Sequence, residues 1–285
     1  MTWLTLLIIS IIAYSLGILL QRVLLKDKSS DPVAYSIVSS IVSGVLIGIY
    51  AIFKEVSLNG LTEVVPQLIL MAILYGSAFY CMFTSLKLIE ASEFSVLFAT
   101  RALWSIIAAI LFLHEQFSVQ QIFGTVLIII SVLIVSLHPN TAKQFKFGRG
   151  QLLALLGAMV FGSSFINDAI ILQKVDALAY SFLIFLIPNI LLWLIFPKTT
   201  KTIRKIVKGQ DLWKLVLLGV FSAVGAVTFF LSYQAGRNAA QIASINQVSI
   251  ITIVFFAIIF LKERSGIWKK VVAAIISFIG VLLVK

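Results

Sequence analysis

Charge and cysteine are scarce in this sequence of 285 residues, and each shortage excludes a class of protein. Charged residues make up 12%, about half their share in soluble domains. With 61% hydrophobic residues and a mean hydropathy of +1.11, a soluble fold of this length could not bury its apolar surface. The single Cys81 excludes an internal disulfide and a cysteine-based metal site. Lipid is therefore the expected solvent.

Several functional motifs are also missing from the sequence. The phosphate-binding loop GxxxxGKS/T does not occur, so we expect no direct drive by ATP. The pair His114 and Glu115 lacks the second histidine of HExxH, and no GxSxG is present. A channel usually has a selectivity filter or rings of like residues, and the sequence shows neither, although a single-chain pore stays open. We expect no enzyme activity, no cofactor and no metal.

Long apolar runs are the dominant feature that is present. Each approaches the ~20 residues that a helix needs to cross the hydrocarbon core, and helix is expected because unpaired backbone groups in lipid each cost several kcal/mol. The runs cover roughly 3–21, 33–53, 65–86, 92–113, 119–137, 151–173, 177–196, 212–235, 240–261 and 268–284. The first run lacks a basic flank and a cleavage site, so we interpret it as a helix and not as a signal peptide. The sequence predicts an all-α integral membrane protein with ten transmembrane helices.

The second half of the chain repeats the first. "FLHEQFSVQQ" (112–121) matches "FLKERSGIWK" (260–269) at an offset of 148, and "DPVAYS" (31–36) matches "DALAYS" (176–181) at an offset of 145. Their order and similar offset favour a duplication, with five helices in each copy. Because five is odd, the second copy enters the membrane upside down, which is typical of secondary transporters. The predicted copies are 1–140 and 148–285.

The segments around these matches resemble a known family. In each copy an apolar helix ends at a glutamate, and an amphipathic link and a glycine-containing apolar helix follow, as in the EamA-type domain of the drug/metabolite transporter superfamily. Glu115 and Gly124 carry the resemblance in the first copy, and Glu263 and Gly280 carry it in the second. "FGSSF" (161–165) resembles the small-residue patch with which each such domain starts. The resemblance implies a ten-helix small-molecule carrier with a central cavity between the repeats.

The same alignment points to structural features. Glu115 and Glu263 end their helices in both copies, so we expect a structural or gating role for them and not substrate binding. The family often has a proline early in the preceding helix, where this chain has about Ala102 and Ile250, so any bend there must arise in another way. Small residues that recur every four positions in the second run predict close helix packing, within the chain or in a homodimer. These residues are Ser36, Ser40, Gly44 and Gly48.

The distribution of Lys and Arg predicts an orientation. The odd-numbered connections between runs carry most of these residues, which places that side in the cytoplasm and both termini outside. The resemblance implies the opposite orientation, because relatives are usually described with cytoplasmic termini. The seventh connection is the most basic, with Lys198, Lys201, Arg204, Lys205, Lys208 and Lys214. The net charge of +11 therefore fits anionic lipid headgroups and gives no reason to expect a nucleic-acid partner.

Arg101 in "SVLFATRALWSII" (95–107) is the most informative single residue. An arginine near the bilayer centre costs about 2.5–3.5 kcal/mol on insertion scales, and it cannot lose its proton. We interpret it as facing a central cavity and pairing with an anionic group of the substrate, such as a carboxylate. The alternative is a structural ion pair with Glu93 or Asp168, although Glu93 lies roughly 12 Å away along the same helix. The repeat aligns Arg101 with Ser249, so only one copy carries a charge at this position. This asymmetry favours a role in substrate recognition over a structural role shared by both copies.

Asp168 is the candidate for proton coupling or for binding an ammonium group, because burial favours the protonated form of a carboxyl. The alternative is an interfacial aspartate that faces water near the end of its helix. Asn246, Gln247 and Ser249 form a polar group in the ninth run, which hydrogen-bonds either a substrate or a neighbouring helix. Gln234 is interpreted in the same two ways.

Four aromatic residues lie well inside apolar runs, away from the ends where interfacial belts are found. Tyr14, Tyr75, Tyr80 and Trp104 could therefore line a cavity, and Trp104 follows Arg101 by one turn, which suits a cation–π contact. Core packing is the alternative for each of them.

Together these patterns predict a secondary transporter in the cell membrane that works by alternating access. Its expected partners are membrane lipids and a small polar metabolite, such as an amino acid or another carboxylate. The main alternative is a flippase for a lipid or a lipid-linked sugar, which would need a cavity open sideways to the bilayer.

Overall fold

The computed structural model describes residues 2–27, 29–113, 118–136, 148–236, 245–246, 248–263 and 266–284, and this part of the chain is helical without strands. Six helices are long and apolar enough to cross a bilayer, and two further apolar helices are shorter. The all-α class is thereby confirmed. The α-helices are α1 (Trp3–Leu25), α2 (Pro32–Phe53), α3 (Val65–Leu88), α4 (Ala91–Phe98), α5 (Arg101–Leu113), α6 (Val119–Ser136), α7 (Arg149–Leu172), α8 (Ala177–Ile195), α9 (Thr200–Lys208), α10 (Leu212–Gly236), α12 (Val248–Phe260) and α13 (Ile267–Val284), with short 3₁₀ turns η1 (Leu61–Val64) and η2 (Pro197–Thr199).

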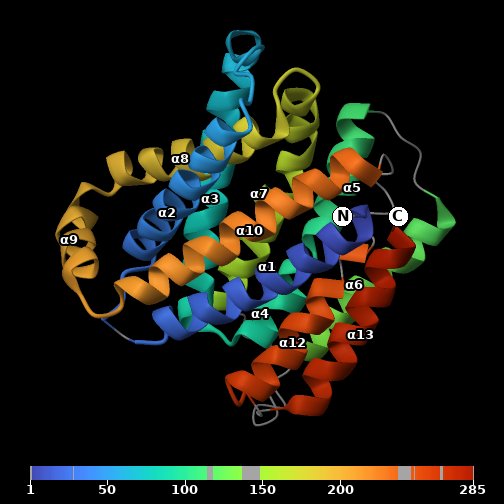
Figure 1. Cartoon of the computed structure of the whole chain (residues 1–285). Helices are drawn as coiled ribbons and strands as arrows, with labels where there is room; N and C mark the ends of the chain where they lie inside the picture. The colour runs from blue at the N-terminus through green and yellow to red at the C-terminus, as the bar shows by residue number, and fades with distance from the viewer. Residues whose placement is uncertain are drawn as a thin grey trace.

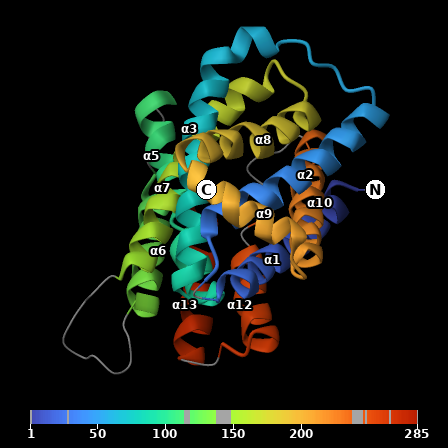
Figure 2. The ribbon, with the colours of Figure 1, turned by 90° about the vertical axis from the view of Figure 1, so that its left-hand side faces the viewer.

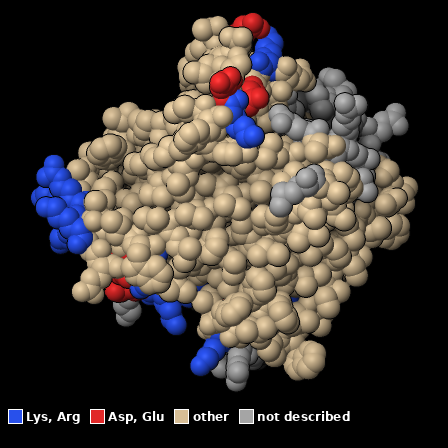
Figure 3. All heavy atoms as spheres, viewed as in Figure 1, with Lys and Arg blue, Asp and Glu red and all other residues tan. Residues whose placement is uncertain are grey.

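Apolar side chains cover the flanks of the molecule. Ile52, Phe53, Leu194 and Trp268 are among many large hydrophobic residues that are exposed. Figure 3 shows a broad uncharged surface, with the Lys, Arg, Asp and Glu side chains gathered toward its margins. Such a surface would aggregate in water, and it suits contact with acyl chains.

The repeated "DPVAYS" and "DALAYS" segments begin equivalent helices by the same device. Asp31 Oδ1 accepts hydrogen bonds from the amides of the two residues after Pro32, at 3.0 and 3.3 Å, and so caps α2. Asp176 Oδ1 accepts from the amides of Leu178 and Ala179, at 2.7 and 3.4 Å, and so caps α8. The match therefore has a physical reason, since an aspartate at this position satisfies amides that lack a partner within the helix.

The expectation of one continuous helix over 92–113 is wrong, because the helix is interrupted between α4 and α5. Around the break, the amides of Ala102 and Leu103 bond to carbonyls only three residues back, at 3.1 and 2.9 Å. The Thr100 hydroxyl also bonds back to the Leu97 carbonyl, at 2.7 Å. Tightened turns and a hydroxyl that competes for a backbone carbonyl both bend helices. The bend therefore arises here without proline.

The helices pack mainly in pairs that are distant in sequence. α1 packs along α10, α3 along α7, α2 along α8, and α6 along α13. Figure 1 shows α1 between α10 and α12, and α6 beside α13. Figure 2 views the molecule from the side on which α9 lies, with α9 between the ends of α8 and α10. The first three of these pairings enclose the site described next.

Candidate functional site

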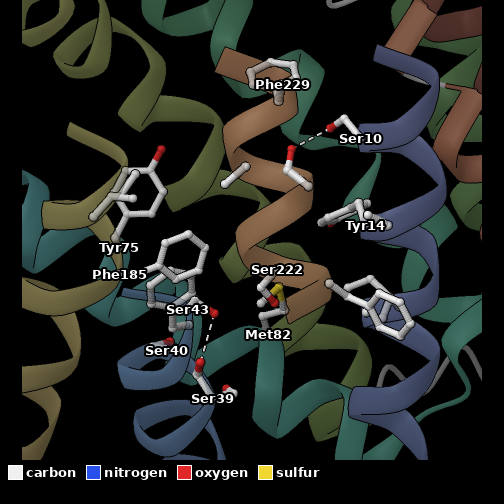
Figure 4. A pocket seen from close by; sticks show the side chains of 18 of the residues that line it. Ser10, Tyr14, Ser39, Ser40, Ser43, Tyr75, Met82, Phe185, Ser222 and Phe229 are labelled. Atoms are coloured by element: carbon white, nitrogen blue, oxygen red, sulfur yellow. Dashed lines mark hydrogen bonds between the residues drawn. The ribbon is translucent and has the colours of Figure 1, made fainter. Parts of the chain in front are cut away.

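A cavity of about 220 Å³ lies between α1, α2, α3, α7, α8 and α10. Figure 4 shows Tyr14 on one side of it and Tyr75 with Phe185 on the other. Nine aromatic residues line it, together with five serines and the side chains of Arg101, Asp168, Gln21 and Asn246. The aromatic residues are Tyr14, Tyr75, Phe79, Phe83, Phe161, Phe185, Phe221, Phe229 and Phe230, and the serines are Ser10, Ser39, Ser40, Ser43 and Ser222.

Arg101, the first residue of α5, lies on the cavity wall and is 8% exposed. Its guanidinium carbon lies 5.2, 5.7 and 5.9 Å from the ring centres of Phe98, Phe161 and Tyr14. Its Nη1 donates a long hydrogen bond of 3.4 Å to the Tyr14 hydroxyl. In the described part of the chain, no carboxylate lies within ion-pair distance of Arg101, so neither Glu93 nor Asp168 pairs with it. The charge is therefore held by ring faces and one weak hydrogen bond.

Gly162 in the "FGSSF" patch determines how closely α7 approaches Arg101. A Cβ atom at this glycine would lie 2.2 Å from the Arg101 carbonyl oxygen and 2.9 Å from the Cβ of Trp104. Only a residue without a side chain fits there, so the patch allows α7 to contact the first turn of α5. The Cβ atom of Trp104 lies at this contact, and Trp104 is not among the described residues that line the cavity.

Asp168 on α7 is buried, with 7% of its surface exposed, so it does not face water as an interfacial aspartate would. Its Oδ2 accepts a hydrogen bond of 2.6 Å from the Tyr75 hydroxyl of α3. Its Oδ1 accepts one of 2.5 Å from the Tyr180 hydroxyl of α8. The carboxylate therefore joins three helices at the cavity wall, with a hydroxyl donor on each oxygen.

Sequence reasoning did not single out several groups at the site. Tyr180 lies in the repeated "DALAYS" segment, and that repeat was the available signal. Gln21 lines the cavity and is 6% exposed, and its Oε1 has no hydrogen-bond partner among the described residues. A glutamine inside the first apolar run was the signal for it. The cavity serines and phenylalanines had no local signal, because such residues are common throughout the chain.

The small residues of α2 divide between packing and the cavity. Ser36 donates to Asn189 Oδ1 of α8 at 3.0 Å, and a Cβ at Gly48 would meet the Phe182 ring of α8 at 3.0 Å. This confirms close packing within the chain. Ser40, in contrast, lines the cavity.

The other predicted site residues differ in where they lie relative to the cavity. Tyr14, Tyr75 and Asn246 are on the cavity wall. Ser249 lines a narrow crevice of about 10 Å³ next to the cavity, and Arg101 and Tyr14 line it too. Tyr80 is away from the cavity and stacks on the ring of Phe196 at a centroid distance of 5.6 Å. The predictions for Gln247 and for the side chain of Gln234 fall outside the described residues, as does that for Glu115.

Comparison with known proteins identifies the family. The sequence profile of the EamA-like transporter family matches residues 1–137 and 148–285. The chain belongs to the EamA-like transporter family. It is therefore a multi-pass membrane transporter of the drug/metabolite type. A solved structure titled "Crystal structure of protein" is similar to this chain, with a TM-score of 0.62 and 14% sequence identity over 96% of this chain and 95% of that one. At this identity the similarity shows the fold alone. No curated protein sequence matches significantly.

In this EamA-like transporter, Glu263 joins the two matched regions directly. Its Oε1 accepts from the Ala91 amide at 3.0 Å, and its Oε2 accepts from the amide and hydroxyl of Ser92 at 3.1 and 2.6 Å. Lys270 forms an ion pair with the adjacent Glu90. The carboxylate thus caps α4, the short helix that leads to the break before Arg101, which agrees with a structural role.

The packing around Gly280 explains why the second copy of the family pattern has a glycine at this position. A Cβ atom at Gly280 of α13 would lie 2.9 Å from the carbonyl oxygen of Gly124 on α6 and 2.9 Å from Ile128 Cγ1. The two family glycines therefore meet where α6 and α13 pack.

Proposed function

We propose that this transporter moves a small polar metabolite with an anionic group, such as an amino acid or another carboxylate, across the cell membrane by alternating access. Arg101 is the observation that carries the proposal. A guanidinium buried on a cavity wall without a counter-ion in the described part of the chain is costly, and a carboxylate supplies the bidentate partner that its planar donors suit.

The rest of the wall supports a small and amphipathic substrate. A volume of about 220 Å³ is below the ~300–1,000 Å³ of pockets for drug-sized ligands. Aromatic rings suit an apolar portion, and serine hydroxyls suit a polar one. Asp168 carries the opposite charge on the same wall, so it is our candidate for binding a substrate ammonium group or for exchanging a coupled proton.

The proposed architecture is ten transmembrane helices in two inverted five-helix repeats, 1–140 and 148–285. The helix pairings support it, because exchanging the repeats turns the α3–α7 contact into the α10–α1 contact and leaves α2–α8 and α6–α13 unchanged. Repeat-equivalent Arg101 and Ser249 line the same crevice, as residues near a twofold axis would. In this proposal the odd-numbered connections are cytoplasmic.

The first test is uptake by purified protein in liposomes, across a panel of amino acids, organic acids, nucleosides and cationic drugs, with and without a pH gradient. Arg101→Gln should lower uptake of a carboxylate substrate at least tenfold, because it removes a charged hydrogen bond worth about 1.5–3 kcal/mol. The matched control is Lys54→Gln, which removes an equal charge from an exposed residue beside Tyr50 and should change uptake less than twofold. Normal carboxylate uptake by both Arg101→Gln and Arg101→Leu would overturn the proposal.

A further inference from the structure

The α9 helix carries an unusual concentration of positive charge on one face. Lys201, Arg204, Lys205 and Lys208 recur at helical spacing, and all four are exposed. The opposite face carries Ile206, which is buried in the hydrophobic core that also contains residues of α2 and α10. Figure 3 shows this group of basic side chains at the left edge of the molecule, where Figure 1 places α9.

These four charges have no counter-ion in the described part of the chain. The neighbouring Asp211 is paired with Lys214, at 2.5 Å, and α9 itself has no acidic residue. Like charges on adjacent turns repel one another, so the face stabilises its own helix poorly. An anionic partner from outside the chain would relieve this repulsion.

The surroundings place α9 at the depth of lipid headgroups. Trp193 near the end of α8 and Trp213 near the start of α10 flank it, and tryptophan is enriched at the membrane–water interface. Trp193 Nε1 also donates to Thr200 Oγ1 at 2.8 Å, which ties α9 to α8. The apolar side chains of Leu194 and Val207 are 74% and 49% exposed, which suits immersion in the bilayer and not contact with bulk water.

We propose that the basic face of α9 is a binding site for anionic phospholipid headgroups of the surrounding bilayer. Lys201, Arg204, Lys205 and Lys208 bind the headgroup phosphates, while Trp193 and Trp213 anchor the two ends of the connection. Because α9 joins α8 to α10, bound lipid holds together two helices that line the cavity. This proposal rests on the positive charge of α9 and on its position at the depth of lipid headgroups. It does not depend on which substrate the cavity binds.

The test is thermal unfolding of the full-length protein in neutral detergent, titrated with phosphatidylglycerol or with phosphatidylcholine. Phosphatidylglycerol should raise the unfolding temperature at much lower concentration than phosphatidylcholine. The double variant K201Q/K205Q should need at least tenfold more phosphatidylglycerol for half the effect, because each basic residue near an anionic surface contributes about fivefold. K201R/K205R keeps the charge and should stay within twofold of the wild type.

The matched control is K54Q/K174Q, which removes the same charge from exposed residues outside α9 and should also stay within twofold. An equal loss in both double variants would overturn the site, because net charge alone would explain it. Equal stabilisation by phosphatidylcholine, by inorganic phosphate or by a short DNA duplex would also overturn it. If K201Q/K205Q does not fold, the single variants R204Q and K208Q serve in its place, each with an expected loss of about fivefold.

Discussion

Arg101 and Asp168 lie on the same cavity wall, but their burial is compensated to different degrees. Both oxygens of Asp168 accept short hydrogen bonds from tyrosine hydroxyls. Arg101 has five N–H donors, of which one reaches a protein acceptor in the described part of the chain, at 3.4 Å. Of these two charged groups, the cation therefore has the greater unmet hydrogen-bonding capacity. This difference is why the proposal assigns recognition first to Arg101 and gives Asp168 a second, separable role.

Replacing Asp168 by asparagine tests that second role. The amide nitrogen of Asp168→Asn cannot accept from a tyrosine hydroxyl, so one buried hydroxyl loses the acceptor for its proton, which costs about 1–3 kcal/mol. The unfolding temperature in detergent should fall, and Tyr75→Phe in the same background should restore part of the loss. If Asp168 carries a coupled proton, uptake by Asp168→Asn should no longer respond to a pH gradient. Full retention of both stability and the pH response would contradict the assignment.

At the level of elements, the sequence predicts where helices begin more reliably than where they bend. The aspartate caps of α2 and α8 are local signals, since the capping side chain and the amides it satisfies are within three residues. The break between α4 and α5 has only a weak local signal in Thr100. It is accompanied by the contact with Gly162, which is distant in sequence, and no apolar run can reveal such a contact. The prediction of a continuous helix failed for that reason.

The substitution Gly162→Ala tests whether the contact between α7 and α5 holds the break. The added Cβ would lie 2.2 Å from a backbone oxygen, which cannot rotate away as a side chain could, so the helices must separate. We expect a loss of about 1–3 kcal/mol or more, measured by thermal unfolding. Gly17→Ala is the control, because its Cβ would meet its nearest neighbours at an ordinary 3.8 Å. Equal stability of the two variants would show that the contact is dispensable.

At the level of the whole molecule, composition was sufficient for the membrane class, and internal matches were sufficient for the family pattern. The site was less accessible to sequence reasoning. Charges inside apolar runs pointed to Arg101 and Asp168, because a buried charge is rare enough to be informative. Ser40 and the cavity phenylalanines were not informative, since packing and lining positions use the same residue types. Tyr80 illustrates the converse, because its place inside a run gave no indication that it stacks on Phe196 away from the cavity.

The proposed inversion of the repeats predicts that equivalent positions in the two copies face opposite sides of the membrane. Ser29 and Lys174 are equivalent by the 145-residue offset of "DPVAYS" and "DALAYS", and both are exposed. In a Cys81→Ala background, a cysteine that replaces Lys174 should react with an impermeant maleimide in intact cells. A cysteine that replaces Ser29 should react only after permeabilisation, because the proposal places the basic odd-numbered connections in the cytoplasm. The reverse pattern would reverse the orientation and preserve the inversion. Labelling of both positions from one side would contradict the inversion itself, since five crossings per copy cannot return equivalent residues to the same face.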